Sequence, residues 1–192
     1  MSFGSVIQWS IEGSWIFFLV YWFAMAFRVK RVVKRQSAAG RMIQFAGGTA
    51  IVILMWNDKI PGGVLASRFV PAARGWALAA ALLTCAGIAI AIWARAILGG
   101  NWSGTVTLKR DHTLTRTGPY AIVRHPIYSG ILLALAGTAL AVGEWRGPLA
   151  VGIAFAMFLV KLRTEERFMT EQFGREYEAY RYATRALIPY IF

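Results

Sequence analysis

Long apolar stretches alternate with short clusters of charge along this 192-residue chain. The apolar stretches are residues 5–27, 42–56, 75–98, 127–145 and 148–160. A helix rises 1.5 Å per residue, so about 20 residues cross a hydrocarbon core of roughly 30 Å, and the shorter stretches must extend or tilt to do so. Only Arg146 and Gly147 separate the last two stretches, which predicts a helical hairpin. The pattern predicts an all-α, polytopic membrane protein with about five transmembrane helices.

Two segments between and after these stretches have a different composition. Residues 99–126 are rich in glycine, proline and polar side chains, which is typical of an ordered, turn-rich loop. Residues 161–182 have apolar side chains at three- and four-residue intervals, which predicts one or two amphipathic helices continuing from the fifth span along the membrane face. Gly174 is expected to break this helical stretch.

The composition agrees with a bilayer as the solvent. Hydrophobic residues make up 57% of the chain and charged residues only 16%, whereas a soluble domain is about 25% charged. The net charge of +12 would suggest nucleic acid in a soluble protein, but 17 of the 21 Lys and Arg residues lie in segments 28–41, 95–126 and 161–192, on one side of the predicted membrane. The positive-inside rule therefore predicts an external N-terminus, a cytoplasmic C-terminus and no nucleic-acid partner. Arg95, near the end of the third span, is expected to snorkel.

Several kinds of chemistry find no support in the sequence. The single cysteine, Cys85, excludes an internal disulfide, and with only two histidines in the chain no metal site is predicted. There is no phosphate-binding glycine loop and no nucleophile elbow. A removed signal peptide is not expected, since no basic segment precedes the first apolar run, and we treat residues 1–192 as one integral membrane domain.

What remains is a set of polar and aromatic residues at the cytoplasmic ends of the hairpin. The set at the entrance to the fourth span comprises Tyr120, Arg124, His125, Pro126 and Tyr128. The set at the exit of the fifth span comprises Arg163, Glu165 and Glu166. If the two spans form a hairpin, the two sets meet in space. Because Glu165 and Glu166 are adjacent on a helix, we expect one to face the site and the other a basic neighbour or water.

These residues carry a resemblance to a known family. The run TGPYAIVRHPIYSG at residues 117–130 is similar to the G-x-Y-x-x-x-R-H-P-x-Y segment of the isoprenylcysteine carboxyl methyltransferase and phospholipid methyltransferase superfamily. The run RTEE at residues 163–166 and the tail that follows resemble the family's E-E segment and C-terminal tail, and residues 101–103 resemble the polar segment before its core. The resemblance covers residues 99–192, the predicted methyltransferase core, whereas residues 1–98 hold three variable N-terminal spans.

The resemblance implies an integral membrane enzyme that uses S-adenosyl-L-methionine and a lipophilic substrate reached from the bilayer. Methyl transfer from a sulfonium needs alignment and a dry pocket but no metal. On this reading Arg163 and Glu166 are the catalytic candidates. The cofactor-binding candidates are Tyr120, Arg124, His125, Pro126, Tyr128, Glu165 and Glu166. Carboxylates and aromatic faces suit the cofactor's cationic groups, and arginine suits a carboxylate.

Other interpretations stay open at this point. Arg124 and Arg163 are also compatible with ordinary positive-inside anchors at the membrane surface. His125-Pro126 is also compatible with a simple N-terminal cap of the fourth helix. The reaction is expected to be carboxyl O-methylation; the alternative is N-methylation of a lipid amine, which requires a base such as His125 or a glutamate. A sterol-reductase-like enzyme using NADPH and a non-catalytic lipid-binding membrane module are the further alternatives.

Overall fold

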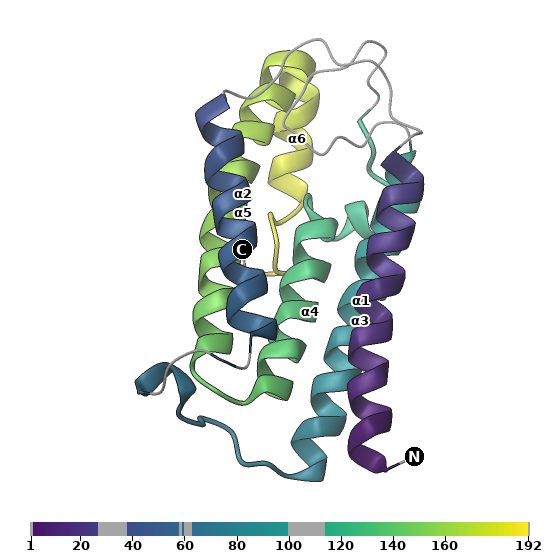
Figure 1. The fold of residues 1–192 in the computed structure, drawn as a ribbon. Coiled ribbons are helices and arrows are strands. Elements are labelled where there is room, and N and C mark those ends of the chain that lie inside the picture. The colour runs from purple at the N-terminus through teal and green to yellow at the C-terminus, as the bar shows by residue number, and fades with distance from the viewer. Residues whose placement is uncertain (1, 27–37, 58, 60–62, 100–113, 192) are drawn as a thin grey trace.

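The computed structural model describes residues 2–26, 38–57, 59, 63–99 and 114–191, and these form a helical bundle (Figure 1). The helices are α1 (Phe3–Ala26), α2 (Ala38–Trp56), α3 (Arg74–Leu98), α4 (Pro126–Val142), α5 (Arg146–Phe173) and α6 (Arg175–Ala183), with short 3₁₀ turns at η1 (Val64–Ala66) and η3 (Gly118–Ala121). The all-α prediction is therefore confirmed. The basic residues of segment 28–35 and the polar segment 101–103 lie outside the described residues.

Five of the helices are apolar, as the hydropathy pattern predicted. Within the described part of the chain, three have both the length and the hydropathy to cross a membrane: α1, α3 and α5. The apolar helices 40–56 and Pro126–Val142 are shorter, so the number of complete crossings stays a prediction. The fourth predicted span was too long by three residues, because Gly143 adopts a left-handed conformation with φ 69° and ends α4 at Val142.

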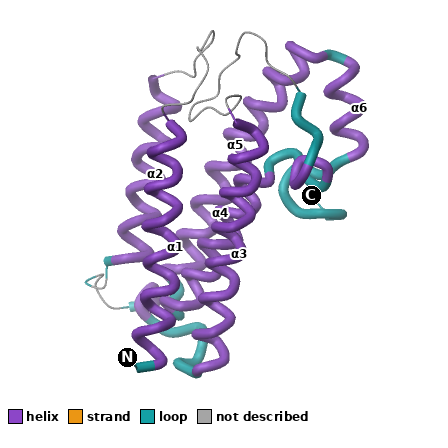
Figure 2. The backbone as a smooth tube through the Cα atoms, turned by 90° about the vertical axis from the view of Figure 1, so that its right-hand side faces the viewer, coloured by secondary structure: helices purple, strands orange, loops and turns teal. Residues whose placement is uncertain are grey.

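The helices lie in the order α1, α3, α4, α5, α2, so that α1 and α2 form the two flanks (Figures 1 and 2). The α3–α4 contact is the most extensive, and it depends on glycine. A Cβ atom added at Gly87 would overlap the backbone of Gly130 and Ala134, and one at Gly137 would overlap the backbone of Thr84. Small residues let helix backbones approach this closely where lipid supplies no hydrophobic driving force.

Two buried arginines tie the flanking helices to this centre. Arg95 is fully buried and donates from Nη1 to the Gly99 carbonyl at 2.7 Å and from Nη2 to the Met25 carbonyl at 2.9 Å, at the ends of α3 and α1. Arg146 is 8% exposed and donates to the Asn57 carbonyl at 2.5 Å, at the end of α2. The last carbonyls of a helix have no partner within it, and a cation there is favourable. The expectation that Arg95 snorkels was wrong, because its donors satisfy these carbonyls instead.

Beyond the apolar part of the bundle, α5 continues as one helix to Phe173, and α6 follows after a single residue. Gly174 has φ 51°, a conformation that glycine adopts without steric cost, and it separates the two helices. This confirms the predicted helical continuation of the fifth span and its break at Gly174. The C-terminal end of α6 lies near the start of α4, and the rest of α6 extends beyond it beside the last part of α5 (Figures 1 and 2).

Candidate functional site

The site begins with a backbone pairing between the run that precedes α4 and the run that follows α6. Val123 and Arg185 form an isolated parallel bridge. The Arg124 amide donates to the Arg185 carbonyl at 2.8 Å, and the His125 amide donates to the Ala186 carbonyl at 3.0 Å. This pairing brings together segments about 60 residues apart in the chain and holds the Arg124-His125 dipeptide against α5.

Upstream of this pairing, the η3 turn buries Tyr120. Gly118 opens the turn with φ 59°, and Pro119 follows at its start. The Tyr180 hydroxyl donates to the Tyr120 carbonyl at 2.7 Å, which ties α6 to the turn. Burial raises the pKa of Tyr180 to about 12, so this hydroxyl keeps its proton and remains a donor at neutral pH.

Arg124 forms a buried ion pair with Glu166. Its Nε lies 2.7 Å from Glu166 Oε1, and the two side chains are only 10% and 12% exposed. Arg124 Nη1 donates to the carbonyls of Thr184 at 2.6 Å and Arg181 at 3.1 Å, at the end of α6. These contacts go to protein groups at defined distances, so Arg124 does more than anchor the chain to lipid headgroups.

His125 lies between the two glutamates. Its Nε2 is 3.2 Å from Glu166 Oε1, and its Nδ1 is 3.5 Å from Glu165 Oε2. Burial lowers the pKa of His125, but the hydrogen bonds and negative charges of Glu165 and Glu166 outweigh burial, so the pKa is raised overall. His125 occupies the N-cap position of α4 and Pro126 its first turn, yet the imidazole makes no capping hydrogen bond to the helix. The interpretation of this pair as a simple helix start is therefore incomplete.

Tyr128 completes the cluster on the side that faces the bundle. Its hydroxyl donates to Glu165 Oε1 at 2.7 Å. Its ring is stacked with the His125 ring at a centroid distance of 5.5 Å and with the Phe158 ring at 4.5 Å. Lys161 Nζ lies 5.4 Å from the centroid of the Tyr128 ring, within the range of cation–π attraction.

The structure thus brings Arg124, His125, Tyr128, Glu165 and Glu166 into one set of contacts, which we call the polar cluster. Both carboxylates contact His125, and Glu166 also pairs with Arg124, a basic neighbour of the kind expected for one of the two; which glutamate faces a bound cofactor stays a prediction. His125 contacts both because the imidazole has a nitrogen on each side and lies between the two adjacent positions of α5.

The remaining predicted residues differ in their relation to the polar cluster. Tyr120 and Pro126 are buried beside it as parts of η3 and the first turn of α4. Arg163 lies one turn before Glu166 on α5 with an exposed side chain, and among the described residues no hydrogen bond or ion pair joins it to the polar cluster. Its catalytic assignment stays a prediction.

Some residues of the site were missed in the sequence. Arg181 Nε lies 3.6 Å from Glu166 Oε2, the Thr184 carbonyl accepts from Arg124, and Phe158 stacks on Tyr128. Phe158 sits seven residues before Glu165, two helical turns away on the same face of α5, and this spacing was a signal that could have found it. The backbone carbonyl of Thr184 had no comparable signal in the sequence, because every residue carries a backbone carbonyl whatever its side chain.

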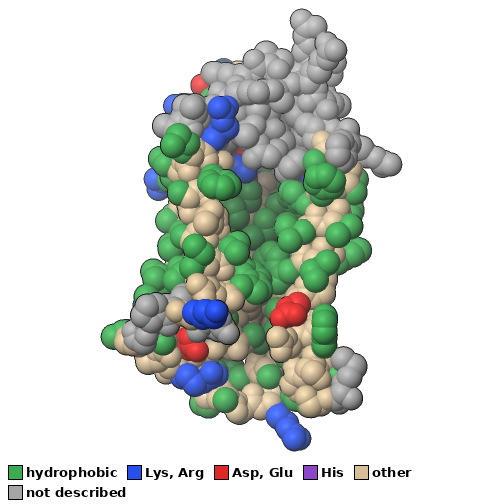
Figure 3. Space-filling view, viewed as in Figure 1, with side chains coloured by type: hydrophobic (Ala, Val, Ile, Leu, Met, Phe, Trp, Pro, Cys, Tyr) green, Lys and Arg blue, Asp and Glu red, His purple; other side chains and the backbone are tan. Residues whose placement is uncertain are grey.

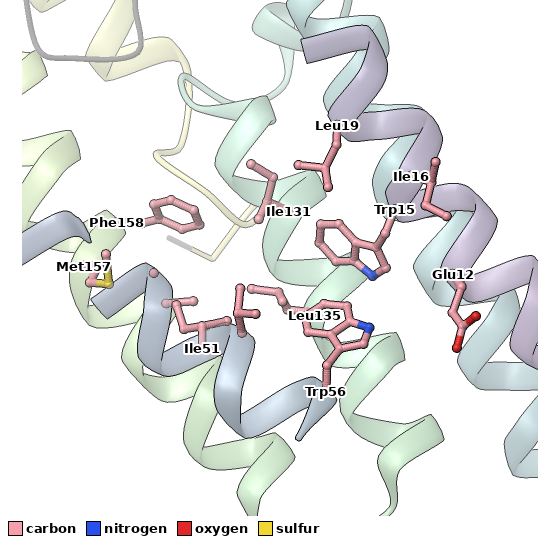
Figure 4. A pocket seen from close by; sticks show the side chains of 13 residues that line it. Glu12, Trp15, Ile16, Leu19, Ile51, Trp56, Ile131, Leu135, Met157 and Phe158 are labelled. Atoms are coloured by element: carbon pink, nitrogen blue, oxygen red, sulfur yellow. The ribbon is translucent and has the colours of Figure 1, made fainter. Parts of the chain in front are cut away.

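An apolar groove of about 550 Å³ adjoins the polar cluster. Its walls come from α1 and α2 and its floor from α4 and α5, and Figure 3 shows the hollow between the two flanks with hydrophobic side chains around it. Trp15 and Trp56 meet edge-to-face across it, with ring centroids 5.8 Å apart (Figure 4). Glu12 is the one ionisable side chain among its lining residues. Phe158 lines the groove and also stacks on Tyr128, so the groove and the polar cluster share a wall.

Known proteins resemble both the sequence and the fold. Residues 79–171 match the model of the isoprenylcysteine carboxyl methyltransferase (ICMT) family. The chain is 35% identical over 96 residues to protein-S-isoprenylcysteine O-methyltransferase of Schizosaccharomyces pombe, covering 48% of this chain and 41% of that protein. It is 31% identical over 96 residues to the cobalt-zinc-cadmium resistance protein CzcN of Cupriavidus metallidurans, covering 49% of this chain and 44% of that protein. The matched regions span less than half the length of these two relatives.

The solved structure of the eukaryotic intramembrane Ras methyltransferase ICMT matches with a TM-score of 0.55 at 20% identity, covering 83% of this chain and 55% of that one. Together with the apolar helices, this match defines a polytopic helical membrane protein with the ICMT fold. The match to the isoprenylcysteine carboxyl methyltransferase family covers residues 79–171, a little under half of the chain, and over these residues the resemblance inferred from the motifs is confirmed.

Proposed function

We propose that this protein is an S-adenosyl-L-methionine-dependent methyltransferase that methylates a carboxylate on a lipophilic substrate. The observation that carries the proposal is the wall shared between the polar cluster and the apolar groove, made by the Tyr128–Phe158 stack. The names of the relatives support an S-isoprenylcysteine as the substrate class, because such a molecule joins a long apolar chain to a carboxylate. The groove suits the apolar chain, and the polar cluster suits the reacting end.

The donor set of the polar cluster fits this cofactor. Glu165 keeps 25% of its side chain exposed, so a carboxylate with aromatic rings beside it remains accessible to a cation. Glu165 and Glu166 would hold the cofactor's cationic groups, and Arg163, with its exposed guanidinium, would hold a carboxylate. When bound, S-adenosylmethionine supplies a methyl group on a positively charged sulfur.

The roles of the chain's own residues follow from their contacts. Arg124 and His125 fix the two glutamates, so that the site is ordered before ligands bind. Phe158 and the groove exclude water from the side that faces the bundle, which strengthens the electrostatic interactions inside. A carboxylate substrate arrives as an anion and loses no proton, so these residues need only bind and orient it.

The structure favours O-methylation over methylation of a lipid amine. An amine must give up a proton before it attacks, and the candidate bases were His125 and a glutamate. Glu165 and Glu166 contact both ring nitrogens of His125, and these contacts lower the pKa of the two carboxylates despite their burial, which favours an acceptor that needs no base. A carboxylate acceptor avoids this requirement.

We also propose that the polar cluster faces the cytoplasm and that the N-terminus lies outside. The support is the distribution of Lys and Arg in the sequence, of which 17 of 21 lie in segments 28–41, 95–126 and 161–192, on the same predicted side as the motif residues. This orientation places the site on the side where a soluble nucleotide-derived cofactor is available.

Binding measurements on detergent-purified protein test the proposal. Calorimetry should detect S-adenosylmethionine or its demethylated product and no NADPH. Glu165→Gln should weaken that binding tenfold or more, since one charge-assisted hydrogen bond contributes roughly 1.5–3 kcal/mol. Glu176→Gln is the matched control, because Glu176 is an exposed glutamate of α6 paired with Arg116 outside the polar cluster. Binding of NADPH without any adenosylmethionine compound would overturn the proposal in favour of a reductase.

Turnover separates the two acceptor classes and a non-catalytic module. A prenylcysteine with a free carboxylate should be methylated, whereas its methyl ester and phosphatidylethanolamine should not. Methylation of phosphatidylethanolamine alone would refute O-methylation. Binding of the cofactor without turnover of any of these would instead favour a non-catalytic lipid-binding module.

A further inference from the structure

The segment after α6 exposes apolar side chains at an unexpected place. Leu187 is 1% exposed and packs beside Tyr120, Tyr128 and other buried residues of the site. The residues that follow are exposed: Ile188 by 46%, Tyr190 by 92% and Ile191 by 78%. We refer to residues 188–191 as the apolar tail. In water such a group of side chains would be unfavourable, so its surroundings need an explanation.

The backbone pairing of this segment fixes the level at which the apolar tail lies. The bridge between Val123 and Arg185 is parallel, so the segment advances in the same direction as the chain that enters α4. The Ser129 hydroxyl then donates to the Leu187 carbonyl at 2.5 Å, one turn inside α4. Figure 1 shows this part of the chain descending from α6 beside the start of α4. The apolar tail therefore begins level with the first turn of an apolar helix.

The length of α4 shows what surrounds that turn. With 17 residues, α4 rises about 26 Å at 1.5 Å per residue, which is less than the roughly 30 Å thickness of a hydrocarbon core. If α4 crosses the bilayer, both of its ends must lie at or inside the edges of the hydrocarbon. Residues level with its first turn then share that environment.

We propose that the apolar tail inserts into the membrane beside α4, with lipid acyl chains as its partner. Ile188, Tyr190 and Ile191 contact the outer part of the hydrocarbon, and Arg185, which is exposed just before them, lies toward the headgroups. Lipid is the occupant because the apolar tail continues the lipid-facing surface of the bundle on the side away from α1 and α2 (Figure 2).

The local backbone agrees with a membrane-embedded turn. The Ile191 amide donates to the Ile188 carbonyl at 3.2 Å, and Tyr190 between them has φ 66°. This left-handed conformation is unfavourable for a residue other than glycine, and burying three large side chains in lipid offsets its cost. Closing the turn by a backbone hydrogen bond also satisfies groups that lipid cannot.

The consequence is a link between the membrane and the polar cluster. The carbonyls of Thr184, Arg185 and Ala186, which bind Arg124 and His125, lie two to four residues before the apolar tail. Anchoring residues 188–191 in lipid therefore sets the depth and orientation of the segment that positions these two side chains.

Quenching of a fluorescent label tests the insertion without any use of enzymatic activity. Two variants are made in a Cys85→Ser background, one with Ile191→Cys and one with Tyr190→Cys. Each carries an environment-sensitive label on its single cysteine and is reconstituted in phosphatidylcholine vesicles. The lipid reference is Leu82→Cys on α3, whose side chain is 62% exposed, and the aqueous reference is Glu178→Cys on the exposed face of α6.

A nitroxide attached near the headgroup end of the lipid acyl chain should quench the labels at 190 and 191 several-fold more than aqueous iodide does. The lipid reference label at position 82 should show the same order. The label at 178 should show the opposite order. If the labels at 190 and 191 behave like the label at 178, the apolar tail lies in water and the inference is wrong, whatever the outcome of the cofactor-binding measurements.

Discussion

The contribution of the Arg124–Glu166 ion pair to stability depends on its burial. A second Arg–Glu ion pair in this protein is exposed, and comparing the two pairs tests this dependence. Arg124 and Glu166 approach to 2.7 Å with side chains 10% and 12% exposed. Arg116 and Glu176 also approach to 2.7 Å, but with side chains 41% and 59% exposed. The two pairs have the same residue types and the same distance, and Glu166 also contacts His125 and Arg181, so Glu→Gln at each position compares a buried, multiply contacted carboxylate with an exposed one.

The structure allows the two losses to be estimated. Removing one partner of a buried pair costs about 3–5 kcal/mol, because the other charge stays buried without compensation. Arg124 keeps the carbonyls of Thr184 and Arg181, and glutamine keeps one acceptor oxygen, so we expect about 2–3 kcal/mol for Glu166→Gln. An exposed pair contributes about 0–1 kcal/mol, which is the expectation for Glu176→Gln.

Thermal unfolding of the purified variants in one mild detergent at pH 7.5 measures the difference. For a chain of this size about 1 kcal/mol corresponds to roughly 2–4 °C, so Glu166→Gln should lower the midpoint by about 4–12 °C and Glu176→Gln by less than about 4 °C. Adding Arg124→Gln to Glu166→Gln should cost less than the sum of the two single changes, because the pair is already broken. Equal midpoints for the two single glutamine variants would refute the argument from burial.

Two further predictions follow from the charges. Glu165 and Glu166 raise the pKa of His125, so protonation of its ring stabilises the folded state. This stabilisation is complete below about pH 6.5, the ordinary pKa of histidine, and it is lost as the pH rises through the pKa of His125 in the folded state. The midpoint temperature of unfolding should therefore decrease as the pH is raised from 6 to 9, and His125→Gln should reduce this pH dependence. A midpoint temperature that increases over this pH range contradicts a raised pKa for His125. The proposed orientation predicts that, without Cys85, an impermeant thiol reagent labels a cysteine at Trp145, which is 49% exposed between α4 and α5, in intact cells but not one at Glu178. Labelling only at position 178 would reverse the proposed topology.

Much of the helical framework could be predicted from the sequence, because hydropathy is a local property. A run of apolar residues must satisfy its backbone hydrogen bonds internally wherever lipid surrounds it, so each run becomes a helix whatever lies next to it. The break at Gly174 and the start of α4 at Pro126 are local for the same reason, since glycine and proline act through their own backbone angles. The motif residues of the hairpin could also be named, and five of them meet in the polar cluster.

Only the tertiary structure decided which partner each polar side chain takes. Arg95 and Arg146 look like ordinary charges at the ends of apolar stretches in the sequence, yet both are buried against the carbonyls of helix ends far along the chain. Glu165 and Glu166 share His125 because the rotation of α5 against α4 places the imidazole between them. A polar group in a low-dielectric interior binds the donor or acceptor that helix packing brings next to it. That packing depends on small residues such as Gly87 and on pairings between distant segments, and neither is determined by the neighbours of a residue in the sequence.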